Sequence, residues 1–156
     1  MRYYLVDRIL EMEPGVRAVG VKCITLSDDL LNEHFPGNPV FPGVLLLEGL
    51  AQTAGRLLAE PTGGQRFALL TSIERVRFMA FARPGDQVNL TVEVEALQDE
   101  SARVRGSATV DDHPIASARL VFRLIEAQGI IPPLFEPFWR HSAAILRGEF
   151  PPVTDE

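Results

Sequence analysis

HFPGNPVFPGVLLLEGLAQTAGRLL, residues 34–58, decides the fold of this chain. Its first ten residues hold three prolines and two glycines, so this loop has few conformations to lose on folding. Pro42 suits the first turn of a helix, because the N–H group that proline lacks has no helical partner there. The sequence predicts a helix from Gly43 to Ala59 that is apolar on nearly every side, which is typical of a helix enclosed by a domain.

One carboxylate interrupts this apolar helix. Glu48 lies four residues before Gln52, so the two side chains share one face. A buried carboxylate is unfavourable unless it is paired or protonated. The residues alone leave three alternatives open, in which Glu48 takes part in catalysis, pairs with Arg56, or faces a contact between subunits.

Length and composition describe one ordinary domain. The chain has 156 residues, 46% of them hydrophobic and 23% charged, which is enough for a core without metals or disulfides. A net charge of −6 without a basic block argues against nucleic-acid binding. The chain has a single cysteine, Cys23, which cannot form an internal disulfide, and its N-terminus lacks the apolar core of a signal peptide. We therefore expect a cytoplasmic protein. No run approaches the roughly 20 apolar residues of a membrane span.

The rest of the chain has the pattern of strands. Alternating apolar residues predict strands at residues 17–26, 67–78, 87–97, 102–110 and 115–124. Residues 3–10 are interpreted as a short arm or helical turn. Short turns make the last three strands an antiparallel meander. We expect an α+β hot-dog fold, in which a curved antiparallel sheet wraps around one long buried helix and its open edge pairs with a second copy.

The composition changes after residue 126. Residues 127–156 contain five prolines, an aromatic cluster and a short helical stretch at 141–147. We expect residues 1–126 to form the hot-dog domain and residues 127–156 to form a C-terminal extension packed on it, not a separate domain. We hypothesise that this extension covers the sheet or narrows a substrate tunnel.

The stretch HFPGNPVFPGVLLLEGLAQ resembles the active-site signature of the FabZ-type 3-hydroxyacyl-ACP dehydratases, which are hot-dog enzymes of fatty-acid synthesis. The similarity extends upstream through Tyr4–Ile9 and downstream to Pro84–Gln87, so it covers about residues 3–126. The resemblance implies dehydration of 3-hydroxyacyl-ACP to trans-2-enoyl-ACP without a cofactor, in fatty-acid synthesis or a related polyketide or polyene pathway. It also implies acyl carrier protein as the partner and a homodimer, or a trimer of such dimers, as the assembly.

The resemblance assigns the site residues one by one. His34 matches the catalytic base and Glu48 the catalytic acid, and in the family the two come from different subunits. The backbone N–H groups of Gly43 and Val44 match positions that polarise the thioester carbonyl. Gln52 is expected to orient Glu48 or to pack at an interface. The chemistry agrees, because imidazole is a suitable base near neutral pH, a protonated carboxyl group can protonate a leaving hydroxyl, and helical N–H groups stabilise an enolate oxygen.

The sequence departs from the family pattern near the site and in the segment expected to contact a carrier protein. Glu33 replaces the glycine that usually precedes the histidine, which adds charge and bulk near the site. The segment Met79–Arg83 is less basic than its family counterpart. Carrier proteins are acidic, so Arg75, Arg77 and Arg83 are candidates for docking as well as ordinary surface charges.

Two other functions compete with dehydration. One is hydrolysis of acyl thioesters on the same fold, and the other is a non-catalytic hot-dog subunit that partners an active enzyme. The remaining histidines, His113 and His141, are interpreted as surface residues. Three scattered histidines without a nearby cluster of acidic or cysteine residues predict no metal site.

Overall fold

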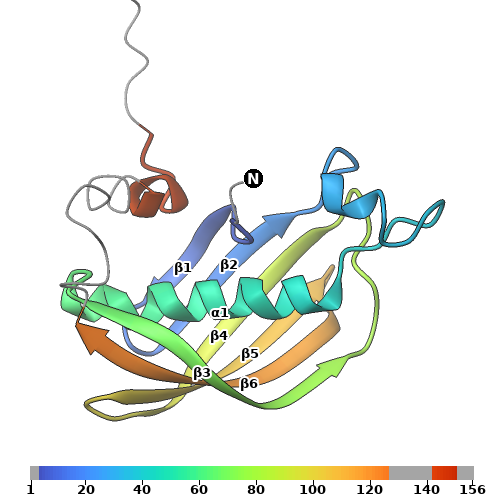
Figure 1. Ribbon diagram of the computed structural model, residues 1–156. Coiled ribbons are helices and arrows are strands. Elements are labelled where there is room, and N and C mark those ends of the chain that lie inside the picture. The colour runs from blue at the N-terminus through green and yellow to red at the C-terminus, as the bar shows by residue number, and fades with distance from the viewer. Residues whose placement is uncertain (1–3, 127–141, 151–156) are drawn as a thin grey trace, which may run out of the picture.

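The computed structural model describes residues 4–126 and 142–150, in which a curved antiparallel sheet wraps around one central helix (Figure 1). The elements are β1 (Arg8–Glu13), β2 (Arg17–Cys23), the 3₁₀ helix η1 (Asp29–Leu31), α1 (Gly43–Ala59), the 3₁₀ helix η2 (Glu60–Thr62), β3 (Arg66–Phe78), β4 (Gln87–Leu97), β5 (Ser101–Val110) and β6 (His113–Glu126). The six strands lie in the order β1-β2-β4-β5-β6-β3, and all neighbours are antiparallel. The predicted α+β architecture and the meander of β4 to β6 are confirmed.

Helix α1 begins and ends at the predicted residues. The carbonyl oxygen of Pro42 accepts hydrogen bonds from the N–H groups of Leu45 and Leu46 at 2.9 and 3.3 Å, so the helix starts directly after the proline-rich loop. At the other end, Pro61 lies in η2 and Gly63 takes a left-handed conformation with φ of 60°. These two residues turn the chain from the helix towards β3.

The prediction for the N-terminal residues is wrong. A short arm or helical turn is predicted for residues 3–10, but the edge strand β1 begins at Arg8 and continues to Glu13. The register between β1 and β2 shifts between Ile9 and Glu11. This bulge leaves Leu10 47% exposed and interrupts the two-residue alternation by which a strand is recognised in a sequence.

The concave face of the sheet encloses α1. Leu50, Ala54 and Leu57 on this helix have no exposed surface and belong to one continuous core with side chains from the strands. Helix α1 contacts all six strands. Within residues 4–126 and 142–150, no helix has the length and apolar character needed to span a membrane.

A short helical segment at residues 142–146 lies against the N-terminal segment. The hydroxyl groups of Tyr4 and Ser142 form a hydrogen bond of 2.8 Å. Leu146 is 7% exposed and joins the core. Residues 127–141, which include His141, and residues 151–156 lie outside the described part of the chain, so the division at residue 126 stays a prediction.

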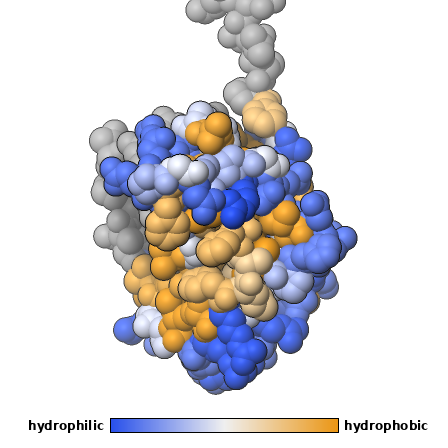
Figure 2. Space-filling model, turned by 90° about the vertical axis from the view of Figure 1, so that its right-hand side faces the viewer, coloured by the Kyte–Doolittle hydropathy of each residue, from blue (hydrophilic) through white to orange (hydrophobic). Residues whose placement is uncertain are grey.

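Within residues 4–126 and 142–150, we single out two apolar surfaces that are exposed. Strand β3 is an edge of the sheet, and its Leu69, Leu70 and Ile73 are exposed. The second surface lies at the N-terminal end of α1, where Figure 2 shows an apolar area bordered by polar residues. Exposed apolar residues in this region are Phe35, Val44, Phe78, Met79 and Phe81. Contiguous apolar surfaces of this kind are typical of interaction sites.

Two glycines in the sheet let it approach α1 closely. A Cβ atom on Gly20 would lie 2.8 Å from the hydroxyl oxygen of Thr53, which is fully buried. A Cβ atom on Gly106 would lie 3.2 Å from Leu50 Cδ1. The Gly20 contact is too short for a real side chain, so even a methyl group there would displace the helix or the strand.

We therefore expect Gly20→Ala to lower the free energy of unfolding by about 1–3 kcal/mol, the usual effect of overpacking a core. Gly55→Ala is the matched control, because a Cβ atom there meets nothing within 4 Å and alanine favours the helix. This control should raise the free energy of unfolding by about 0.5–1 kcal/mol. Urea unfolding measures the free energy of unfolding of both variants. Equal stability of the two would contradict the close packing of Gly20 against Thr53.

Candidate active site

The loop before α1 fixes the imidazole ring of His34. His34 Nδ1 lies 2.9 Å from the carbonyl oxygen of Val40, and the N–H group of Val40 donates to the carbonyl oxygen of His34, also at 2.9 Å. A carbonyl oxygen can only accept, so Nδ1 carries the hydrogen in this contact. The neutral ring then has its lone pair on Nε2, which is the arrangement that a general base needs.

The first turn of α1 presents backbone donors beside an aromatic ring. The N–H groups of Gly43 and Val44 precede the first helical hydrogen bonds, which start at Leu45. Val44 is 64% exposed. A Cβ atom on Gly43 would lie 2.9 Å from the ring of Phe78, so glycine makes room for this side chain. The phenyl ring therefore packs beside the N–H groups that the resemblance assigns to the thioester carbonyl.

One turn further along α1, two polar side chains are held in a fixed orientation. Gln52 Oε1 accepts a hydrogen bond of 3.0 Å from the N–H group of Leu5, so Gln52 Nε2 must point the other way. There it donates a hydrogen bond of 3.1 Å to Glu48 Oε1. Glu48 Oε2 is thereby the oxygen left to exchange a proton with a ligand. The predicted orienting contact between Gln52 and Glu48 is present in the structure.

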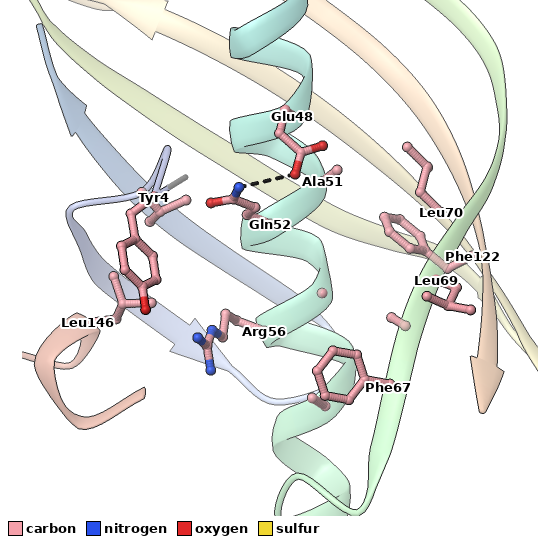
Figure 3. Close-up of a pocket in the computed structure, with 14 residues that line it drawn as sticks. Tyr4, Glu48, Ala51, Gln52, Arg56, Phe67, Leu69, Leu70, Phe122 and Leu146 are labelled. Atoms are coloured by element: carbon pink, nitrogen blue, oxygen red, sulfur yellow. Dashed lines mark hydrogen bonds between the residues drawn. The ribbon is translucent and has the colours of Figure 1, made fainter. Parts of the chain in front are cut away.

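Glu48 and Gln52 line a cavity of about 320 Å³ that runs along α1 (Figure 3). One wall comes from β3, with Phe67, Leu69 and Leu70. The N-terminal segment and the C-terminal helical segment supply the opposite side, including Tyr4 and Leu146. Most of this lining is apolar, so the cavity suits a hydrocarbon chain.

Arg56 lies in the same cavity, two turns of helix beyond Glu48. Burial lowers the pKa of the Arg56 guanidinium, and the neighbouring cation of Arg147 acts in the same direction. Tyr4 and Glu60 oppose this shift. A cation is thus placed in a mostly apolar surrounding, where its charge interacts more strongly than it would in water.

The structure brings only part of the predicted site together within one chain. Glu48 and Gln52 share the cavity, whereas His34 is not among the residues that line it. His113, interpreted as a surface residue, is exposed, and its Nδ1 lies 2.8 Å from the carbonyl oxygen of Asp111. Among the described residues, no group of three or more His, Cys, Asp or Glu side chains is placed to hold a metal ion.

Sequence reasoning missed most of the cavity walls. Arg56 was considered only as a possible partner of Glu48, although it continues the four-residue spacing of Glu48 and Gln52 on one face of the helix and so could have been expected beside them. No local signal points to Tyr4 or Leu146, because they come from opposite ends of the chain and meet only through the fold.

The family model described as the FabA-like domain matches residues 1–119. The chain is 42% identical over 125 residues to "3-hydroxyacyl-[acyl-carrier-protein] dehydratase FabZ" of Chloroflexus aggregans. This alignment covers 80% of this chain and 87% of the relative. A hot-dog-like protein from Thermanaerovibrio acidaminovorans has a similar structure, with a TM-score of 0.62 and 19% identity. The superposition covers 83% of this chain and 93% of that protein. A chain of the dehydratase heterocomplex ApeI:P from Xenorhabdus doucetiae gives a TM-score of 0.58 and 20% identity. This superposition covers 77% of this chain and 98% of that one.

The sheet wrapped around α1, with a histidine-bearing loop at the head of the helix, defines a hot-dog protein. The chain belongs to the FabA-like family. Its similarity to the FabZ relative spans nearly the whole length of that relative, so the predicted resemblance to FabZ-type dehydratases and the predicted hot-dog fold are both confirmed.

The double role of Gln52 gives a structural prediction. Gln52→Met keeps the length of the side chain but removes the acceptor for the buried N–H group of Leu5. We expect the free energy of unfolding to fall by about 1–3 kcal/mol, because a buried donor loses its partner. Hydrogen exchange of the Leu5 amide should become faster.

Gln87→Met is the control, because Gln87 is exposed at the start of β4 and its replacement should change stability by less than about 0.5 kcal/mol. A Gln52→Met variant as stable as the wild type, with the Leu5 amide still protected, would show that this hydrogen bond does not form in solution.

Proposed function

We propose that this protein dehydrates 3-hydroxyacyl groups carried as thioesters on acyl carrier protein, and releases trans-2-enoyl thioesters and water. The observation that carries the proposal is an oriented carboxyl group, Glu48, at the head of an apolar cavity in a chain that is 42% identical to a FabZ dehydratase. This reaction would be the dehydration step of fatty-acid synthesis or of a related polyketide or polyene pathway. It needs no cofactor.

His34 acts as the base in this proposal. Its Nε2 lone pair removes the proton from the carbon next to the thioester carbonyl, while Nδ1 stays bonded to the carbonyl oxygen of Val40. Negative charge then develops on the thioester oxygen. The N–H groups of Gly43 and Val44, at the positive end of the helix dipole, stabilise this charge.

Glu48 acts as the acid. Its Oε1 is occupied by the amide of Gln52, and its Oε2 delivers a proton to the hydroxyl group as the carbon–oxygen bond breaks. The hydroxyl leaves as water, and the electron pair of the broken C–H bond becomes the new double bond. The proton held by His34 restores the acid, directly or through solvent.

Each active site is proposed to be completed by a second copy of the chain. Glu48 lines the cavity and His34 of the same chain does not, so one chain alone supplies half of the catalytic pair to it. The free edge of β3, with exposed Leu69, Leu70 and Ile73, is suited to pair with the same edge of another copy. The proposed assembly is therefore a homodimer built on β3.

Acyl carrier protein is the proposed partner, and the cytoplasm the proposed location. The exposed Arg83 donates a hydrogen bond of 2.8 Å to Asn38, so a cation lies beside the loop that bears His34. Arg77, near the end of β3, is also exposed. These cations are suited to attract an acidic carrier protein.

The first test is absorbance of the conjugated enoyl thioester after purified protein is added to a 3-hydroxyacyl-ACP. Wild-type protein should form this product, and His34→Ala should be about 10²- to 10⁴-fold slower, as expected for loss of a general base. His113→Ala is the matched control, because this histidine is exposed and far along the chain from the loop. Its activity should equal that of the wild type.

Two outcomes would replace the proposal. Release of free thiol without enoyl product would indicate a thioesterase. A folded assembly without turnover, which gains activity only after a second hot-dog chain is added, would indicate a partner subunit.

Mixing two inactive variants tests the shared site. His34→Ala and Glu48→Gln subunits, unfolded and refolded together, should recover about one quarter of wild-type activity, since half of the dimers are mixed and each of those has one intact site. His34→Ala mixed with the double variant should recover nothing. If the first mixture also stays inactive although mixed dimers form, both catalytic residues belong to one subunit.

A further inference from the structure

The short helical segment at residues 142–146 forms part of one wall of the cavity along α1. Its Leu146 lines the cavity beside Tyr4, on the side of α1 that faces away from β3 (Figure 3). The match to the family model ends at residue 119, so this segment lies beyond it. The family resemblance therefore does not account for this part of the wall.

Contacts at both ends of this segment hold it against the rest of the protein. Ser142 is buried, and its hydroxyl group forms the 2.8 Å hydrogen bond with the hydroxyl group of Tyr4. One helical turn later, Leu146 is also buried and belongs to the same core as the side chains of α1. Ser142 and Leu146 are four residues apart, so they share the face of the segment that is turned towards the domain.

The backbone fixes where the segment ends. The N–H group of Glu149 donates a hydrogen bond of 3.0 Å to the carbonyl oxygen of Ala144. The N–H group of Gly148 donates one of 2.8 Å to the carbonyl oxygen of Ile145, and Gly148 takes a left-handed conformation with φ of 79°. These two hydrogen bonds and this glycine form a Schellman motif, which ends a helix at a defined residue. The turn that presents Leu146 to the cavity is therefore defined by its own sequence as well as by its packing.

The room for an acyl chain lies along α1 and is limited. The helix residues that line the cavity extend from Glu48 to Ala59, which is about 16 Å of helix. An acyl chain with its 3-hydroxyl group at Glu48 extends past Gln52 into the part of the cavity that has Leu146 on one side and β3 on the other. The volume of about 320 Å³ is near the lower limit of the roughly 300–1,000 Å³ of small-molecule sites, so the size of each wall residue matters.

We propose that Leu146 is a specificity-determining residue, whose side chain limits the length of the acyl chain that the cavity holds beyond Gln52. This inference rests on the proposed dehydratase function and concerns the choice of substrate at the same site. Leu146 contacts the far carbons of the chain and takes no part in the proton transfers at His34 and Glu48. A leucine at this place excludes carbon atoms that a smaller side chain would admit.

A series of 3-hydroxyacyl-ACP substrates of increasing chain length tests the limit in the full-length protein. Wild-type kcat/KM should fall by about tenfold or more between the longest chain that fits and a chain about two carbons longer, because a hydrophobic site discriminates by such factors for each methylene group. Leu146→Ala removes about three carbon atoms from the wall and should move this fall to chains about two carbons longer. Leu146→Phe adds bulk and should move the fall to shorter chains.

Ile145→Ala is the matched control for the truncated leucine. Ile145 is the neighbouring large aliphatic residue, is 36% exposed, and is not among the residues that line the cavity, so its replacement should leave the chain-length profile unchanged. Leu146→Met keeps the volume of the wall and should also keep this profile. Leu146→Phe keeps a large apolar side chain in the core, so it still tests the limit if Leu146→Ala does not fold. An equal loss of kcat/KM at all chain lengths in the Leu146 variants, or the same shift in Ile145→Ala, would overturn the proposal.

Binding of saturated acyl-ACP, which cannot be dehydrated, separates this inference from the reaction itself. Calorimetry should show that affinity falls at the same chain length as kcat/KM, and at a greater length in Leu146→Ala. If wild type, Leu146→Ala and Leu146→Phe share one length profile while 3-hydroxyacyl chains are dehydrated, the inference fails and the dehydratase function stands. If the binding profile shifts in these variants but nothing is dehydrated, the reaction is wrong and the length limit stands.

Discussion

Enclosure of α1 by the curved sheet is the physical constraint on which the rest of the structure depends. The helix has 17 residues, eight of them buried, and those eight include Leu50 and Leu57. Each large apolar side chain of this kind stabilises the fold by about 1.5–3 kcal/mol when it is fully buried. The sheet reaches the helix only because Gly20 and Gly106 lack side chains at the contact. Packing, more than polar contacts, therefore sets the position of the helix.

The face of α1 that the sheet leaves uncovered becomes the candidate site. Glu48, Gln52 and Arg56 follow one another at four-residue spacing on this face, between β3 and the N-terminal segment. The hydrogen bond from the N–H group of Leu5 orients Gln52, and Gln52 in turn orients Glu48. His34 is oriented separately by the carbonyl oxygen of Val40. The two groups that we propose for proton transfer are thus both oriented before a substrate arrives, which would reduce the reorganisation needed during reaction.

The sequence predicted what depends on local signals and missed what depends on distant contacts. The limits of α1 follow from Pro42 at its start and the Pro61–Gly64 segment at its end, and both signals act within a few residues. Strand β1 was missed because its bulge breaks the alternation on which a strand prediction depends. Tyr4 and Leu146 were missed as cavity walls, since no periodicity joins the two ends of a chain. Whether His34 and Glu48 belong to one catalytic site could be stated only through a family resemblance.

Strand β3 is both an edge of the sheet and a wall of the cavity. Phe67, Leu69 and Leu70 line the cavity, and Leu69 and Leu70 are also exposed on a strand whose outer edge has no neighbour in the sheet. An unpaired edge strand is free to twist, whereas a second strand bound to it fixes its backbone. Any chain that pairs with β3 therefore changes the freedom of one cavity wall. By linkage, whatever pairing does to the affinity for a ligand on that wall, the ligand does to the stability of the paired state by the same factor, so the two equilibria are coupled through this one strand.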